Sequence, residues 1–247
     1  MFNFNQNNNM NFVGQDMQTV ASHRTFIANV FSWMTAALAI TAFFAYYFST
    51  SKDFFESLYT VTSAGSVAMS GIGWIVMLAP LAMVLIMSFG FNKLSAGMLT
   101  ILFIAYSFLM GMSLSFIFLV YTSASVYLTF AVTAGTFGVM ALAGYTTKID
   151  LSKFGSIMFM GLIGIIIASL VNMFMKSQMM DWVISIAGVL VFTGLTAYDV
   201  QKLKKMGSQI DASAEPARKF VIMGALTLYL DFINLFLFLL RFLGNRK

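Results

Sequence analysis

Two aspartates, Asp199 and Asp231, lie inside stretches of sequence that are otherwise apolar enough to span a membrane (TAYDV at 196–200 and LYLDF at 228–232). An ionised carboxylate at the centre of a membrane helix costs about 2.5 kcal/mol or more, so such a residue usually faces a protein interior or a wet cavity and has a partner. Because the two aspartates lie on successive apolar stretches, each is the natural partner of the other. We therefore expect them to form an ion or proton site.

Two carboxyl groups that meet in a membrane interior cannot both ionise at low cost, so they are expected to share one proton. The same pair, together with carbonyl and amide oxygens, suits a hard cation such as Ca²⁺. That ion would be transported, and the sequence indicates no resident cofactor. Each aspartate also has a simpler interpretation. Asp199 could be an interfacial carboxylate paired with Lys202, and Asp231 could form a structural hydrogen bond to a neighbouring helix.

Polar residues around Asp231 fall on one face of the expected helix. Thr227, Asp231 and Asn234 are spaced by four and three residues, and the opposite face is Leu, Ile and Phe. This pattern predicts a helix that faces the protein interior. Arg241 either continues the polar stripe or extends its side chain to the membrane interface. Asn172, in SLVNMFM, either lines the same interior or only bonds a neighbouring helix.

The composition indicates that the solvent is a lipid bilayer. Hydrophobic residues make up 60% of the 247 residues and charged residues 9%, against roughly 25% charged in a soluble domain. The chain has no cysteine and one histidine, and it lacks the sequence patterns of zinc hydrolases, serine hydrolases and P-loop enzymes. An enzyme is therefore not expected. The basic residues lie in short loops and the net charge of +5 is modest, so nucleic-acid binding is not expected either.

Seven apolar runs of about 20 residues are each long enough to cross a membrane. They predict an all-α integral membrane protein with a polar tail at 1–22, disordered or lying on the surface, and a seven-helix domain at 23–247. The runs are Ile27–Phe48, Val67–Phe89, Ala96–Val120, Ser125–Tyr145, Gly155–Met175, Trp182–Leu203 and Phe220–Leu243. The break between the third and fourth runs, VYTSAS, is the weakest of these boundaries.

The basic residues of the loops favour an N-terminus in the cytoplasm, because cytoplasmic loops carry the excess of Lys and Arg. With that orientation nine of the fourteen basic residues lie inside and five outside, three of the five at the C-terminal end. A six-span alternative, with the last segment re-entrant, would place the C-terminus inside. The sequence shows no eukaryotic sorting signal, which favours the bacterial plasma (inner) membrane.

Three segments resemble the Bax inhibitor-1 family, also called the transmembrane Bax-inhibitor-motif family. They are TAYDVQKLK at 196–204, LYLDFINLFLFLLRFLG at 228–244 and GMSLSFIFLVY at 111–121. The resemblance implies a seven-helix fold with the C-terminal helix at its centre. It also implies a pH-sensitive calcium leak governed by an aspartate pair that matches Asp199 and Asp231, a role in stress protection, and contact with a membrane-bound AAA protease.

One feature of the family is missing. Some members carry an arginine near the end of the second helix that latches the aspartate pair, but this chain reads MSFGFNKLSAG at 87–97, where Lys93 is the nearest cation.

Three functional hypotheses remain. The first is a passive, pH-gated cation pathway with calcium as the ion. The second is a regulatory protein that binds a membrane AAA protease or another helical partner, with structural aspartates. The third is a proton-coupled transporter. Flux that depends on Asp199 and Asp231 would separate the ion hypotheses from the binding hypothesis.

Overall fold

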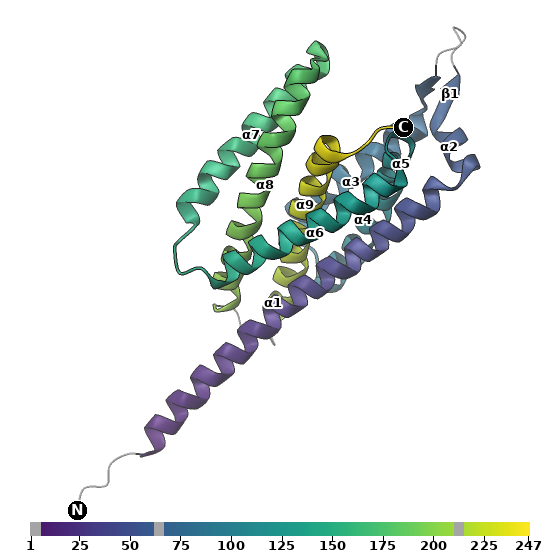
Figure 1. Cartoon of the computed structure of the whole chain (residues 1–247). Coiled ribbons are helices and arrows are strands. Elements are labelled where there is room, and N and C mark those ends of the chain that lie inside the picture. The colour runs from purple at the N-terminus through teal and green to yellow at the C-terminus, as the bar shows by residue number, and fades with distance from the viewer. Residues whose placement is uncertain (1–5, 62–66, 210–214) are drawn as a thin grey trace, which may run out of the picture.

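The structure, a computed structural model, consists almost entirely of helices (Figure 1). It describes residues 6–61, 67–209 and 215–247, and the side chains at 24–58, 68–209 and 216–247. The helices are α1 (Gln6–Ser49), α2 (Lys52–Leu58), α3 (Gly71–Gly90), α4 (Ala96–Leu114), α5 (Ile117–Val120), α6 (Ser123–Thr146), α7 (Ser152–Met175), α8 (Gln178–Gly207) and α9 (Glu215–Leu243). Two short strands, β1 (Tyr59–Val61) and β2 (Val67–Met69), pair antiparallel.

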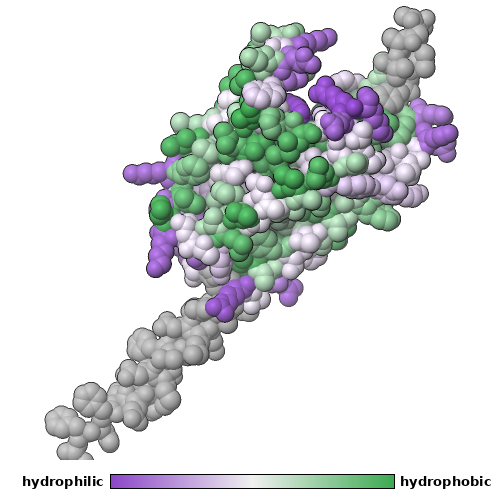
Figure 2. Space-filling model, in the orientation of Figure 1, coloured by the Kyte–Doolittle hydropathy of each residue, from purple (hydrophilic) through white to green (hydrophobic). Residues whose placement is uncertain are grey.

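Seven helical segments in the described part of the chain are long and apolar enough to cross a membrane, which confirms the predicted all-α membrane fold. They correspond to α1 from Arg24 onward, α3, α4 with α5, α6, α7, α8, and α9 from Pro216 onward. Figure 2 shows hydrophobic surface over the middle of the molecule and hydrophilic residues towards its two ends. A bilayer would cover that apolar surface.

Three of the predicted segments differ from the structure by more than a shift of their ends. The second apolar run begins too early, because Val67–Met69 forms β2 and α3 begins only after Ser70, whose hydroxyl accepts a hydrogen bond from the amide of Gly73 (3.1 Å). The third run is interrupted at Ser115, after which α5 adds a single turn. Hydropathy does not reveal either break, since the residues concerned are apolar or small. The polar segment predicted as a tail carries helix from Gln6 onward, and its first five residues lie outside the described part.

The break at VYTSAS is a true turn. Thr122 caps the start of α6 by accepting from the amide of Ser125, and the C-terminal tail pairs with the same turn. The amide of Thr122 donates to the carbonyl of Asn245 (3.1 Å), and the amide of Lys247 donates to that of Val120 (2.9 Å). These bonds tie the end of α9 to the α5–α6 junction.

Helix α9 lies at the centre, as predicted. It packs against α1, α4, α6 and α8, and Ala225, Leu228, Tyr229 and Leu235 on it have no exposed surface. It is one continuous helix of 29 residues, long enough to cross a membrane, which favours the seven-span prediction over the re-entrant alternative. The environment of Asp231 is therefore protein on most sides.

Helices α7 and α8 form a hairpin at the edge of the molecule (Figure 1). α8 packs on α6 and α9, whereas the main neighbour of α7 is α8. Close packing of α8 on α6 depends on Gly144, because a Cβ atom there would collide with the backbone carbonyl of Ala197. Ala197 lies half a turn before Asp199, so this contact helps to set the position of Asp199 next to α9.

Candidate functional site: an aspartate pair in a cavity between three helices

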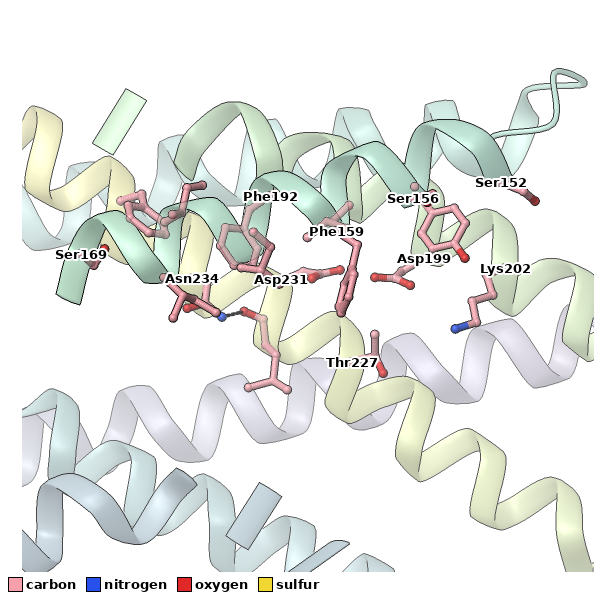
Figure 3. A pocket seen from close by; sticks show the side chains of 18 of the residues that line it. Ser152, Ser156, Phe159, Ser169, Phe192, Asp199, Lys202, Thr227, Asp231 and Asn234 are labelled. Carbon is pink, nitrogen blue, oxygen red and sulfur yellow. Dashed lines mark hydrogen bonds between the residues drawn. The ribbon is translucent and has the colours of Figure 1, made fainter. Parts of the chain in front are cut away.

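Asp199 of α8 and Asp231 of α9 point toward one another (Figure 3). The negative charge of Asp199 acts on Asp231 at this approach. A carboxylate without a proton can only accept a hydrogen bond, so two facing carboxyl groups can bond to each other only when one of them carries a proton. The structure thus brings together the two aspartates that the sequence singles out.

The two carboxyl groups differ in burial. Asp231 is 5% exposed, and its Oδ2 has no hydrogen-bond partner in the described part of the chain. Asp199 is half-buried, and the positive charge of Lys202, less than a turn further along α8, acts on it. Asp231 is therefore the inner member of the pair and Asp199 the one nearer the end of the cavity.

A cavity of about 1040 Å³ surrounds the pair between α7, α8 and α9. Most of its lining is apolar, and the polar residues along it, besides the two aspartates and Lys202, are Ser152, Ser156, Ser169, Tyr198, Thr227 and Asn234. Figure 3 shows the three serines distributed along α7, from Ser152 to Ser169. The aspartate pair lies between the two ends.

Thr227 and Asn234 line this cavity together with Asp231, so the predicted polar stripe of α9 faces one space. The hydroxyl of Thr227 donates to the carbonyl of Met223 (3.0 Å), and Nδ2 of Asn234 donates to that of Leu230 (2.8 Å). The Thr227 hydroxyl and one N–H of Asn234 donate within α9, and the two side-chain oxygens remain as acceptors beside the aspartates.

Arg241 and Asn172 do not line the cavity. Asn172 is 5% exposed and donates through Nδ2 to Asp181 (2.8 Å), while its Oδ1 accepts from the amide of Ser177 (3.0 Å). Nη1 of Arg241 lies 3.9 Å from the same Asp181 carboxylate. Both residues thus belong to a second polar cluster, where the α7–α8 turn meets the end of α9.

Sequence reasoning missed Asp181, the centre of this second cluster. A signal was available, since Asp181 falls in the first turn of α8, directly after the capping Ser177, where a carboxylate is favoured. What the sequence does not indicate is that residues from α7 and α9 converge on it.

A polar contact on the opposite side of α9 holds the helix in place. The hydroxyl of Thr41 in α1 donates to the carbonyl of Ser107 in α4 (2.9 Å), which leaves the Tyr229 hydroxyl to donate to Thr41 (2.7 Å). The ring of Tyr106 packs edge-on against Tyr229 at 5.2 Å. The sequence does not predict this contact, because its members lie 66 and 188 residues apart.

The oxygen donors limit which metals the site could hold. The described residues contain no group of three or more His, Cys, Asp or Glu side chains that could bind a metal ion. Calcium takes six to eight oxygen ligands, so two carboxylates with Thr227, Asn234 and water would hold it only loosely.

Comparison with known proteins gives a consistent result along nearly the whole chain. Residues 23–247 match the family model described as inhibitor of apoptosis-promoting Bax1. The chain is 53% identical over 232 residues to the inner membrane protein YbhL of Escherichia coli strain K12, covering 94% of this chain and 96% of that protein. It is 45% identical over 233 residues to an uncharacterized protein of Borreliella burgdorferi, covering 94% and 97%.

Proposed function

The chain belongs to the Bax inhibitor-1 family, and from that premise we propose that it is a pH-sensitive cation leak of the bacterial inner membrane, with Ca²⁺ as the ion and its N-terminus in the cytoplasm. One observation carries the proposal: Asp199 and Asp231 face each other inside a cavity between three membrane-spanning helices. A role in stress protection would follow from control of resting calcium.

The gating step is the loss of the shared proton. Two carboxylates about 4 Å apart repel by about 4 kcal/mol at an effective dielectric constant near 20. That energy would bias a two-state arrangement of α8 and α9 by several hundred-fold. A cation between the carboxylates would relieve the same repulsion. Deprotonation is therefore expected to favour both opening and calcium entry, so flux should rise as the pH rises.

Lys202 is the basic residue whose charge could act on this aspartate pair. Lys93 is exposed in the turn between α3 and α4, whereas Lys202 lines the cavity and its charge acts on Asp199. We therefore expect Lys202, and not a cation from the α3–α4 turn, to compete with an entering metal ion.

The test is calcium uptake into liposomes that contain the purified protein, followed with a calcium dye sealed inside. We expect calcium uptake well above that of protein-free liposomes, and we expect this uptake to increase with pH. Proteoliposomes no leakier to calcium than empty ones at every pH would end the proposal.

A second function, binding of a membrane-bound AAA protease, is favoured by the exposure of α7. This helix packs mainly on α8 and presents Ile157, Ile167 and Phe174 on its outer surface, the last 80% exposed. A partner helix could cover that surface without using the aspartates. In vesicles that contain both proteins, Ile167→Trp should then weaken an effect on proteolysis, while Leu142→Trp on the exposed face of α6 and Asp231→Asn should not. Equal effects of the two tryptophan variants would exclude docking through α7.

A further inference from the structure

The cavity around the aspartate pair has an apolar side formed by α7. Phe159, Ile166, Leu170 and Met173 line it, and each is more than half exposed. In a membrane protein, exposed apolar side chains at this depth meet lipid tails. Because α7 packs mainly on α8 and not on α9, the cavity can be reached from the bilayer between α7 and α9.

The size of the cavity exceeds what a metal ion requires. Its volume of about 1040 Å³ is at the upper end of the roughly 300–1,000 Å³ typical of sites for drug-sized molecules. A single water molecule takes about 30 Å³ of liquid, so a metal ion would need a large number of waters to fill the remaining space against apolar walls. An organic ligand fills such a space with fewer unsatisfied contacts.

The lining combines negative charge with aromatic rings. Phe159, Phe192 and Phe238 line the cavity with the aspartates, and Figure 3 shows Phe159 projecting from α7 toward the two carboxyl groups. Aromatic faces attract cations, and more strongly where water is excluded. A ligand with a carboxylate group would instead be repelled by the negative charge of the aspartate pair.

Asp231 supplies the polar anchor for such a cation. Its carboxyl group is buried and directed into the cavity, and no donor in the described part of the chain satisfies its Oδ2. An ammonium group carries N–H donors for Asp231 and Asp199 at once, and needs no shell of six or more oxygens.

We propose that this cavity binds an amphiphilic organic cation, an ammonium head on an alkyl tail, that enters sideways from the bilayer between α7 and α9. The head lies between Asp199 and Asp231 beside Phe159, and the tail lies along Ile166, Leu170 and Met173. This ligand uses the same aspartate pair as the proposed leak, but its binding requires no flux.

The test uses full-length protein in lipid nanodiscs and a dodecylammonium probe with a photoreactive diazirine on the tail. After irradiation, the labelled peptides are mapped by mass spectrometry. Labelling should concentrate on the cavity-lining side of α7 and on α9. An excess of decylammonium, which carries no diazirine, should compete with the probe and reduce this labelling. Decyl sulfate, with the same tail and the opposite charge, should not.

Three variants separate a specific site from simple partitioning into lipid. Asp231→Asn should reduce cavity labelling by about tenfold, the size expected for loss of one charge-assisted contact. Leu170→Trp should reduce cavity labelling because the larger side chain fills the space for the tail. Leu170 is exposed, so the substitution should leave the fold intact. Asp150→Asn, in an exposed loop, is the matched control and should leave labelling unchanged.

Labelling spread evenly over lipid-facing helices such as α3, or equal competition by decyl sulfate, would overturn the proposal. The outcomes also separate the two functions. Calcium flux without cavity labelling refutes the organic-cation site alone, and cavity labelling without calcium flux refutes the leak alone.

Discussion

Asp231 and Tyr229 lie two residues apart on α9 and therefore point to opposite sides of the helix. Tyr229 is held by Thr41 of α1 and packs against Tyr106 of α4, while Asp231 faces the cavity and Asp199. The contact on the Tyr229 side thus fixes the rotation of α9 about its axis. That rotation places a carboxyl group in the cavity instead of against lipid.

A pair of conservative substitutions tests this role. Tyr229→Phe removes the hydrogen bond to Thr41 and should destabilise the protein by about 1 kcal/mol. Tyr106→Phe removes a buried hydroxyl that has no partner in the described residues, and should be neutral or stabilising. Thermal unfolding in detergent measures both. Equal losses for the two variants would show that the Tyr229 hydroxyl has no special role.

Asp150 lies in the loop between α6 and α7, outside the membrane-spanning segments, and should make the stability of the fold depend on pH. Hydrogen bonds from Lys205 and Ser152 lower the pKa of Asp150 from 3.8 to about 2. A lowered pKa in the folded state stabilises the fold above the unfolded value, and this contribution is lost as the pH falls from about 4 through about 2.

Asp150→Asn should therefore lower the melting temperature slightly at neutral pH, with a difference from wild type that shrinks as the pH falls through this range. High salt should shrink it too, because the Lys205–Asp150 pair is exposed. Asp53→Asn serves as the control, as Asp53 makes no ion pair among the described residues. A difference that persists below pH about 2 would mean that the ion pair is not its cause.

At the scale of elements, the position of Asp199 depends on how closely α8 approaches α6. Gly144 permits that approach, because a side chain there would meet the backbone of Ala197. Backbone atoms cannot rotate away as a side chain can, so the two helices would have to separate. Gly138, also in α6, has open space where a side chain would begin.

Gly144→Ala should therefore cost about 1–3 kcal/mol, as overpacking does, whereas Gly138→Ala should be neutral or slightly stabilising through helix propensity. Unfolding midpoints in a mild denaturing detergent compare the two. An unchanged unfolding midpoint for Gly144→Ala would show that α6 and α8 are farther apart than in the structure.

The elements themselves were largely predictable, and their contacts were not. Seven spans follow from apolar runs, and the interior face of α9 follows from the spacing of Thr227, Asp231 and Asn234. Hydropathy could not reveal β2 or the interruption at Ser115, since hydrogen bonds and not polarity end those segments. The partners of Arg241 and Asn172 depend on how three helices meet at Asp181, which no local pattern encodes.

For the molecule as a whole, the alternation of spans sets which ends share a side of the membrane. Lys153 and Arg218 lie at the starts of α7 and α9, and Lys52 and Arg246 lie at the opposite ends of spanning segments. With the N-terminus in the cytoplasm, the first two are inside and the last two outside. The excess of basic residues on the first side favours this orientation.

Single cysteines test the orientation cleanly, because the chain has none of its own. In intact spheroplasts a membrane-impermeant maleimide should label Lys52→Cys and Arg246→Cys, and should label Lys153→Cys and Arg218→Cys only after permeabilisation. The reverse pattern would mean an outward N-terminus. Labelling of Arg218→Cys and Arg246→Cys from one side would mean that α9 does not cross.

The central claim is that Asp199 and Asp231 act together as a proton-controlled gate, and the pH profile of calcium flux tests it most directly. In proteoliposomes, wild-type flux should rise between about pH 5 and pH 8, by up to several hundred-fold if the full repulsion is used. Asp231→Asn and Asp199→Asn should each flatten the profile, because one remaining carboxylate has no like charge to repel, while Asp53→Asn should follow the wild type. If both intramembrane variants keep the wild-type pH profile, the pair is structural and the gate lies elsewhere.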